Sequence, residues 1–276
     1  MLDGRVALIT GANTGIGRVT ARELARRGDR VFLACRSFDR TRSVLAEIRA
    51  VRPDAVAEWL PLELSDFHSV RTCAQMFLAR DLPLHLLVNN AGVAGARGLT
   101  PSGFEFMFGV NHMGHFLLTQ LLLGRIKSSA PARVVTVASR SHARVRGIDW
   151  SAVRRPTATL TGVKEYCVSK LANVLFSAEL SRRLHGSGVS TYSLHPGVVD
   201  SDIWRTLPRS VRALNRLRLI STVEGAKTTL HCAASDVAGG ETGLYYTKER
   251  PAPPSAAAQS HALAEELWRH SEEALL

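Results

Sequence analysis

The sequence has few cysteines, no long apolar run and none of the usual signatures of nucleic-acid-binding modules. Its four cysteines are scattered and form no Cys-x-x-Cys pair, so we expect neither a disulfide framework nor a metal site, and a reducing, cytoplasmic compartment. No apolar run reaches the roughly 18 residues that a membrane-spanning helix needs. Because no RNA-binding motif and no basic region joined to a zipper occurs, we expect no nucleic-acid partner.

Acidic residues are also scarce. The chain has 24 Asp and Glu against 35 Lys and Arg, a formal net charge of +11. This excess favours anionic partners, such as a phosphate-rich cofactor or an acidic lipid surface. The first strand is expected from Arg5, so we expect neither a signal peptide nor an N-terminal anchor.

Short strand signals alternate with helical patterns along the 276 residues. The predicted strands cover residues 6–9, 31–34, 56–62, 84–88, 133–137, 189–194 and 244–246. The predicted helices include 39–51, 66–80, 101–127 and the segment that carries Tyr166 and ends near residue 184. Strands separated by helices of this length imply βαβ crossovers, hence an α/β fold with a parallel sheet covered on both faces.

We expect one domain over residues 1–250 and a helical tail over residues 251–276. In the tail, Leu263, Leu267 and Trp268 recur at helical spacing. Their apolar stripe is expected to dock on the body or on a partner subunit.

A glycine-rich turn follows the first strand. Residues 10–17 read Thr-Gly-Ala-Asn-Thr-Gly-Ile-Gly, with glycine at positions 11, 15 and 17. Such a turn lets the backbone approach a pyrophosphate, and the following helix offers free N–H groups and the positive end of its dipole. The alternative is an ordinary glycine-rich turn, because the spacing departs from Gly-x-Gly-x-x-Gly.

The end of the second strand bears on the choice of cofactor. An acidic residue there would bind the ribose 2′-hydroxyl of NAD, but the chain has Arg36 and Ser37 instead. Both can bind a 2′-phosphate, and Arg18 and Arg40 could reinforce the site. NADP(H) is therefore favoured, unless Arg36 is only a solvated surface charge.

A polar tetrapeptide, Asn-Asn-Ala-Gly, follows the fourth predicted strand at residues 89–92. It falls at the carboxyl end of the strand, where open α/β sheets bind their ligands. Asn90 can bridge backbone groups there, and Gly92 lets the backbone pass close to a cofactor. A plain turn would give the same local pattern.

Tyr166 and Lys170 lie one helical turn apart and share a helix face. We expect the ammonium to stabilise the phenolate and to lower the tyrosine pKa. Tyr166 could then exchange a proton with a carbonyl or alcohol oxygen. Ser139, at the end of the fifth predicted strand, could bind and polarise that oxygen.

These motifs occur in the order found in short-chain dehydrogenases/reductases, and the chain resembles that family from Gly4 to about Tyr246. The resemblance implies a single-domain, Rossmann-type doubly wound sheet and a nicotinamide cofactor. It implies a catalytic set of Asn111, Ser139, Tyr166 and Lys170, in which Asn111 holds a water that connects to Lys170. Ser139 and Tyr166 would also contact the substrate.

The resemblance extends to the residues that would contact the cofactor. In this sequence they are Gly11, Asn13, Thr14, Gly15, Ile16, Gly17, Arg36, Ser37, Glu63, Leu64, Asn90, Gly92, Tyr166, Lys170, Pro196, Val199 and Ser201. Two of them depart from the common family pattern. Glu63 precedes Leu64 where the family commonly has Asp against the adenine, and Ser201 replaces a more usual Thr.

Three segments are similar to the retinol dehydrogenase-like branch of the family. They are residues 34–36, 111–116 and 170–176. Members of that branch mostly act on lipophilic aldehydes or ketones with NADPH, often on membranes. The resemblance therefore implies a small lipophilic carbonyl or alcohol substrate and a homo-oligomer, although we expect no N-terminal anchor like that of the membrane-bound members.

Residues 204–219 carry a stripe of arginines and a parallel stripe of apolar residues. They could form a substrate lid that touches anionic lipid, or only a solvated charged face. Two non-enzymatic functions also remain open at this stage. One is a cofactor-sensing binding protein without turnover, and the other is an adaptor on lipid surfaces.

Overall fold

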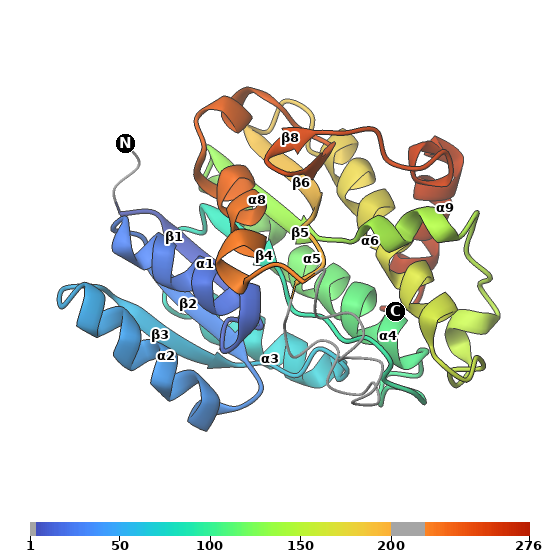
Figure 1. Cartoon of the computed structure of the whole chain (residues 1–276), viewed down its shortest axis with the longest axis horizontal. Coiled ribbons are helices and arrows are strands. Elements are labelled where there is room, and N and C mark those ends of the chain that lie inside the picture. Colours follow the sequence, from blue (N-terminus) through green and yellow to red (C-terminus); the bar gives the residue numbers. More distant parts are fainter. Residues whose placement is uncertain (1–3, 200–218) are drawn as a thin grey trace.

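The computed structural model describes residues 4–199 and 219–276, and in them strands and helices alternate as the sequence predicts (Figure 1). The strands are β1 (Val6–Thr10), β2 (Arg30–Cys35), β3 (Ala57–Pro61), β4 (Leu86–Asn89), β5 (Ala132–Val137), β6 (Val189–His195), β7 (Leu244–Thr247) and β8 (Arg250–Pro251). All seven predicted strands are present. The short β8 was not predicted and forms a hairpin with β7.

The longer helices are α1 (Gly15–Arg26), α2 (Phe38–Val51), α3 (Phe67–Leu78), α5 (Gly114–Ser128), α6 (Val163–Arg183), α8 (Thr222–Ala234) and α9 (His261–Glu273). The predicted helix over residues 101–127 is wrong at its start. The segment becomes helical only at α4 (Phe106–Phe108), continues through a π-helical turn, η1 (Gly109–Met113), and then enters α5. Asn111 lies in the middle of the π-helical turn.

The sheet has the order β3-β2-β1-β4-β5-β6-β7-β8 in the described residues, and all neighbours are parallel except β7 and β8. The chain moves outward from β1 to β3 and then returns to β4 on the other side of β1. The carboxyl ends of β1 and β4 therefore lie at the point where the strand order reverses. Crevices at such points bind ligands in doubly wound folds.

Apolar side chains fill the space on both faces of the sheet. One cluster joins the sheet to α3, α5, α6 and α9, and a second cluster joins the opposite face to α1, α2 and α8. Buried strands of this kind read as nearly continuous apolar runs, as in β1, where all five residues are buried. The result is a three-layer α/β domain, which confirms the predicted fold class.

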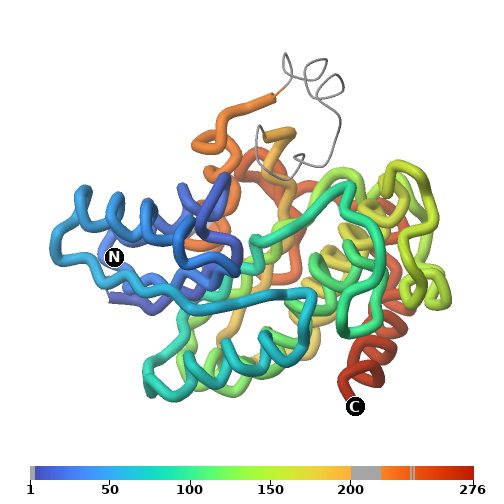
Figure 2. Tube along the Cα trace, turned by 90° about the horizontal axis from the view of Figure 1, so that it is seen from below, coloured from blue at the N-terminus to red at the C-terminus, as the bar shows by residue number. Residues whose placement is uncertain are grey.

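The C-terminal tail folds back onto its own chain. Helix α9 packs against α6 (Figures 1 and 2). The ring centroid of Trp268 lies 5.1 Å from that of Phe116 and 6.0 Å from that of Phe176. The tail is therefore docked on the body, one of the two positions expected for it.

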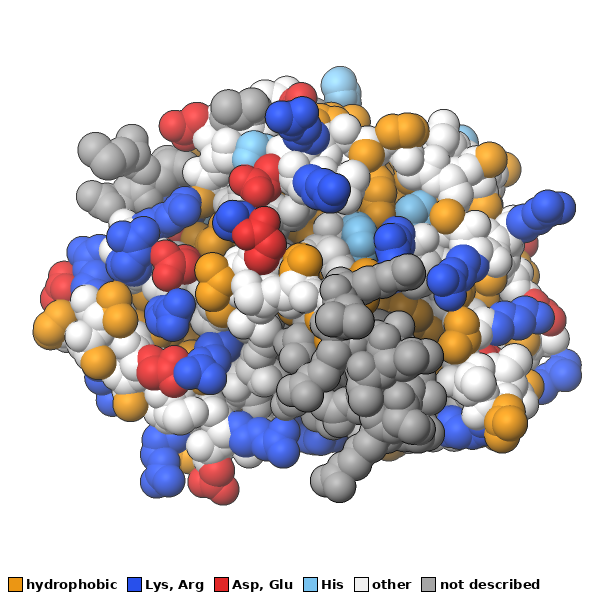
Figure 3. Space-filling model, viewed as in Figure 1, with side chains coloured by type: hydrophobic (Ala, Val, Ile, Leu, Met, Phe, Trp, Pro, Cys, Tyr) orange, Lys and Arg blue, Asp and Glu red, His pale blue; other side chains and the backbone are white. Residues whose placement is uncertain are grey.

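Charged side chains of both signs are distributed over the face shown in Figure 3, with lysines and arginines most frequent toward its margins. No helix in residues 4–199 and 219–276 combines the length and apolar character that crossing a bilayer requires. The predicted amphipathic segment 204–219 lies outside the described residues, apart from its last position.

Candidate active site

The glycine-rich turn and the Asn-Asn-Ala-Gly segment pack against each other at the switch point. The hydroxyl of Thr10 accepts hydrogen bonds from the backbone N–H groups of Asn90 (3.0 Å) and Ala91 (2.9 Å). In return, the Asn90 side chain donates to the carbonyl of Thr10 at 2.8 Å. Asn90 thus bridges backbone groups, as its position in the sequence suggests.

This packing requires glycine at position 17. A Cβ atom there would lie 2.5 Å from the Asn90 amide nitrogen and 2.5 Å from the Gly11 carbonyl oxygen. Gly11 itself has a φ of +64°, in the left-handed region that glycine adopts most easily. The glycines therefore shape the turn and allow it to sit against Asn90.

The N-terminus of α1 suits an anionic group. The first turn of the helix carries no acidic residue, and Thr14 does not cap the helix through its side chain. The N–H groups of Gly15, Ile16 and Gly17 lie at the positive end of the helix dipole. These features fit the pyrophosphate of a dinucleotide, which would bind here through backbone N–H groups.

The predicted 2′-phosphate residues lie at the end of β2. Arg36 is exposed and forms an ion pair with Glu63 at 3.1 Å. Ser37 caps α2 by accepting a hydrogen bond from the backbone N–H of Arg40, so its hydroxyl proton remains available to donate. Arg18, expected to reinforce this site, is instead paired with Glu47 at 2.9 Å.

The structure also brings together cofactor candidates that lie far apart in the sequence. Ile16 and Val199 meet at Gly225 of α8, where an added Cβ would lie 2.5 Å from Val199 and 3.3 Å from Ile16. Val199 is 4% exposed and pairs with Ile220 through an isolated bridge. The segment that contains Pro196 therefore approaches the glycine-rich turn. Ser201 lies outside the described residues.

Ser139 lies close enough to Tyr166 for its hydroxyl to lower the tyrosine pKa. Ser139 stands two residues after the end of β5, and Tyr166 lies in the first turn of α6, where it contacts Ala94 and Met107. Both side chains are almost fully buried, with 8% exposure. The two hydroxyls can therefore bind the same substrate oxygen.

The prediction that Lys170 lowers the pKa of Tyr166 is wrong. Burial raises the pKa of Tyr166 to about 12, and the Ser139 side chain only partly offsets this effect. The Lys170 ammonium lies 5.8 Å from the centre of the Tyr166 ring and donates instead to the Val137 carbonyl at 3.0 Å. Burial also lowers the pKa of Lys170 to about 8.

Asn111 joins the π-helical turn to α6 and to the loop after β4. Its carboxamide oxygen accepts from the Val93 N–H at 2.8 Å, and its amide nitrogen donates to Val93 O and to the Ser169 hydroxyl. Ser169 in turn donates to the carbonyl of Tyr166. The sequence reasoning missed Ser169, although its position one residue before Lys170 in α6 could have indicated it.

The sequence model of the family described as short chain dehydrogenase matches residues 5–211. The chain belongs to this short-chain dehydrogenase family. Retinol dehydrogenase 12 of Mus musculus is 45% identical over 288 residues, which cover 99% of this chain and 87% of that protein. Retinol dehydrogenase 11 of Homo sapiens is 43% identical, with coverage of 97% and 84%. The predicted retinol dehydrogenase-like resemblance is thereby confirmed.

Solved short-chain dehydrogenase-like structures agree with the fold. A putative uncharacterized protein from Mycobacterium Paratuberculosis superposes with a TM-score of 0.78 at 32% identity, covering 99% of this chain and 93% of that one. Pseudomonas aeruginosa RhlG, in an active-site complex with NADP, has a TM-score of 0.71 at 26% identity, with coverage of 88% and 94%. This short-chain dehydrogenase is therefore an oxidoreductase of a family that uses a nicotinamide cofactor.

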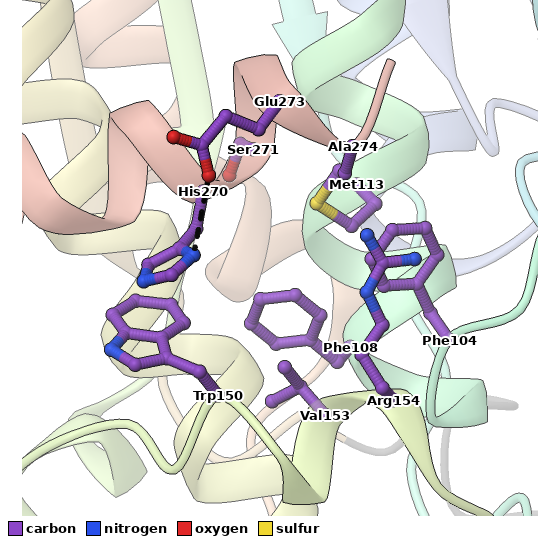
Figure 4. A pocket seen from close by; sticks show the side chains of 10 residues that line it. All are labelled: Phe104, Phe108, Met113, Trp150, Val153, Arg154, His270, Ser271, Glu273 and Ala274. Carbon is purple, nitrogen blue, oxygen red and sulfur yellow. Dashed lines mark ion pairs between the residues drawn. The ribbon is translucent and has the colours of Figure 1, made fainter. Parts of the chain in front are cut away.

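A pocket of about 120 Å³ lies away from these residues, between α9, the α4–η1 segment and residues 150–154. Figure 4 shows Trp150 and His270 together on one side and Arg154 beside Phe104 on the other. The Trp150 and His270 rings are stacked with centroids 4.3 Å apart. None of the predicted catalytic or cofactor residues lines this pocket, so we do not assign it to the substrate.

Proposed function

We propose that this short-chain dehydrogenase transfers a hydride between NADP(H) and a small lipophilic aldehyde, ketone or alcohol. The proposal rests above all on the buried pair of Ser139 and Tyr166, whose side chains interact near the switch point of the sheet. Bound nicotinamide would supply or accept the hydride at the substrate carbon. The lipophilic substrate is inferred from the similarity to retinol dehydrogenases 11 and 12.

Tyr166 would act as the general acid or base. Because burial raises its pKa to about 12, the phenol carries its proton at neutral pH and can donate it to a carbonyl oxygen. Ser139 would bind that same oxygen and stabilise the charge that develops on it. Asn111 and Lys170 would support this exchange, and Lys170 would also help to hold the nicotinamide ribose.

The preference for NADP(H) is assigned to Arg36 and Ser37. Both stand at the end of β2, where an acidic residue would select NAD. Arg36 can pair with a 2′-phosphate and Ser37 can donate to it, since its hydroxyl acts only as an acceptor in capping α2. Gly11, Gly17 and Asn90 would keep the turn close to the pyrophosphate.

Tyr166→Phe tests the proposed function. The variant should lose at least roughly a hundredfold in kcat for the reduction of a lipophilic aldehyde, because general acid catalysis contributes about that much or more. Its affinity for NADPH, followed by fluorescence titration, should stay close to that of the wild type. Unchanged kcat would contradict the role of Tyr166 and would favour a binding protein without turnover.

Tyr192→Phe is the matched control. Tyr192 is fully buried in β6 and donates to backbone carbonyls near the end of α8, at Ala238 and Glu241. Removing its hydroxyl should lower the stability of the fold but leave kcat near the wild-type value. A loss of kcat in both variants would mean that the Tyr166 effect is structural.

A further inference from the structure

His115 connects two parts of the candidate site that are 105 positions apart in the sequence. Its Nε2 atom lies 2.8 Å from the hydroxyl of Thr10, in the glycine-rich turn. Its Nδ1 atom lies 3.0 Å from the backbone carbonyl oxygen of Asn111, in the π-helical turn. The ring is 1% exposed, so neither contact is shared with bulk solvent.

These partners determine which ring nitrogen carries the proton. The carbonyl of Asn111 can only accept, so Nδ1 must be the donor. The hydroxyl of Thr10 already accepts from the N–H groups of Asn90 and Ala91. Its one proton is better placed for Nε2 at 2.8 Å than for the Val88 carbonyl at 3.4 Å. Nε2 is therefore the acceptor, and the imidazole is neutral. Burial and the nearby charge of Lys170 both oppose its protonation and lower the pKa of His115 to about 4.

The two groups bonded to His115, Thr10 and Asn111, serve different parts of the candidate site. Thr10 holds the Asn90 segment against the glycine-rich turn, where the cofactor is expected. Asn111 holds Val93 and Ser169 beside Tyr166. His115 bonds to one member of each group and so links them in addition to the chain segment 90–93.

We infer that His115 is a positioning residue that fixes the cofactor turn relative to the Asn111 turn. This inference rests on the proposed function, because the alignment matters only if cofactor and proton donor act on one substrate. The ring itself touches neither the substrate nor the reacting atoms. It fixes the position of one turn relative to the other through one donated and one accepted hydrogen bond.

The test compares His115→Phe with His112→Phe. His112 is an equally buried histidine in the same helical segment, but it bonds to Ser271 of α9, away from the candidate site. His115→Phe should lower kcat by about tenfold or more and weaken NADPH binding severalfold, since two buried hydrogen bonds are lost. His112→Phe should keep both values within about threefold of the wild type.

Each kcat value is divided by the fraction of protein that binds NADPH, so that simple unfolding does not lower it. His115→Gln, which can still donate and accept, should recover part of the lost rate. The inference is overturned if His115→Phe keeps the wild-type kcat, or if His112→Phe loses as much. A wild-type protein with no turnover on any carbonyl would instead refute the proposed function, which separates the two failures.

Discussion

The guanidinium of Arg36 lies 3.1 Å from the carboxylate of Glu63, so two residues proposed to contact the cofactor are paired with each other. Glu63 also accepts from the backbone and the hydroxyl of Ser65, which hold it in position. A 2′-phosphate bound at Arg36, as proposed, would therefore compete with a carboxylate for the same cation. The pair is partly exposed, so its own contribution to stability is small.

Arg36→Ala should weaken NADPH binding by roughly ten- to a hundredfold while changing NADH binding little, because only NADPH carries the 2′-phosphate. The two dissociation constants can be measured by fluorescence titration at one ionic strength. Equal losses for both cofactors would mean that Arg36 acts on the fold and not on the phosphate.

Glu63→Gln should have the opposite effect. Removing the carboxylate frees the guanidinium and takes away a negative charge next to the expected phosphate. We expect NADPH to bind several times more tightly, with the difference shrinking at high salt. Weaker NADPH binding in this variant would show that the Glu63 carboxylate contributes directly to cofactor binding.

The oxidation of an alcohol should become faster as the pH rises from about 7 to 9, whereas reduction of the matching aldehyde should not. Oxidation requires the deprotonated phenol of Tyr166, which is scarce because burial holds the tyrosine pKa near 12. Reduction uses the protonated phenol, which predominates throughout that range. Initial rates in both directions at saturating cofactor measure this difference, and a rising rate of reduction would contradict it.

Local spacing in the sequence was sufficient to predict much of the fold. Tyr166 and Lys170 share a helix face by spacing alone, and the glycine-rich turn follows from its place between β1 and α1. The π-helical turn at Gly109–Met113 was missed, because Asn111 is anchored by Val93 and Ser169, partners from distant parts of the chain. The prediction of a lowered Tyr166 pKa was wrong for a similar reason, since the burial that raises this pKa depends on how the whole domain packs.

The C-terminal helix should contribute strongly to stability through Trp268. The indole is 3% exposed, lies over Phe116 and Phe176, and has the Arg183 guanidinium 4.3 Å from its ring centre. Trp268→Ala removes these contacts and leaves a cavity, which typically costs about 3–5 kcal/mol. In a chain of this size, that loss corresponds to a fall in Tm of roughly 10 °C.

Glu265→Ala is the control for this prediction, because Glu265 is exposed on the same helix, where it pairs with His261. Its unfolding free energy should stay within about 0.5 kcal/mol of the wild type. Thermal melts with and without NADPH measure both variants. Because α9 lies on the outer side of α6, NADPH should raise the Tm of Trp268→Ala by about as much as it raises that of the wild type. A Tm shift that vanished only in Trp268→Ala would mean that the tail helix also supports the cofactor site.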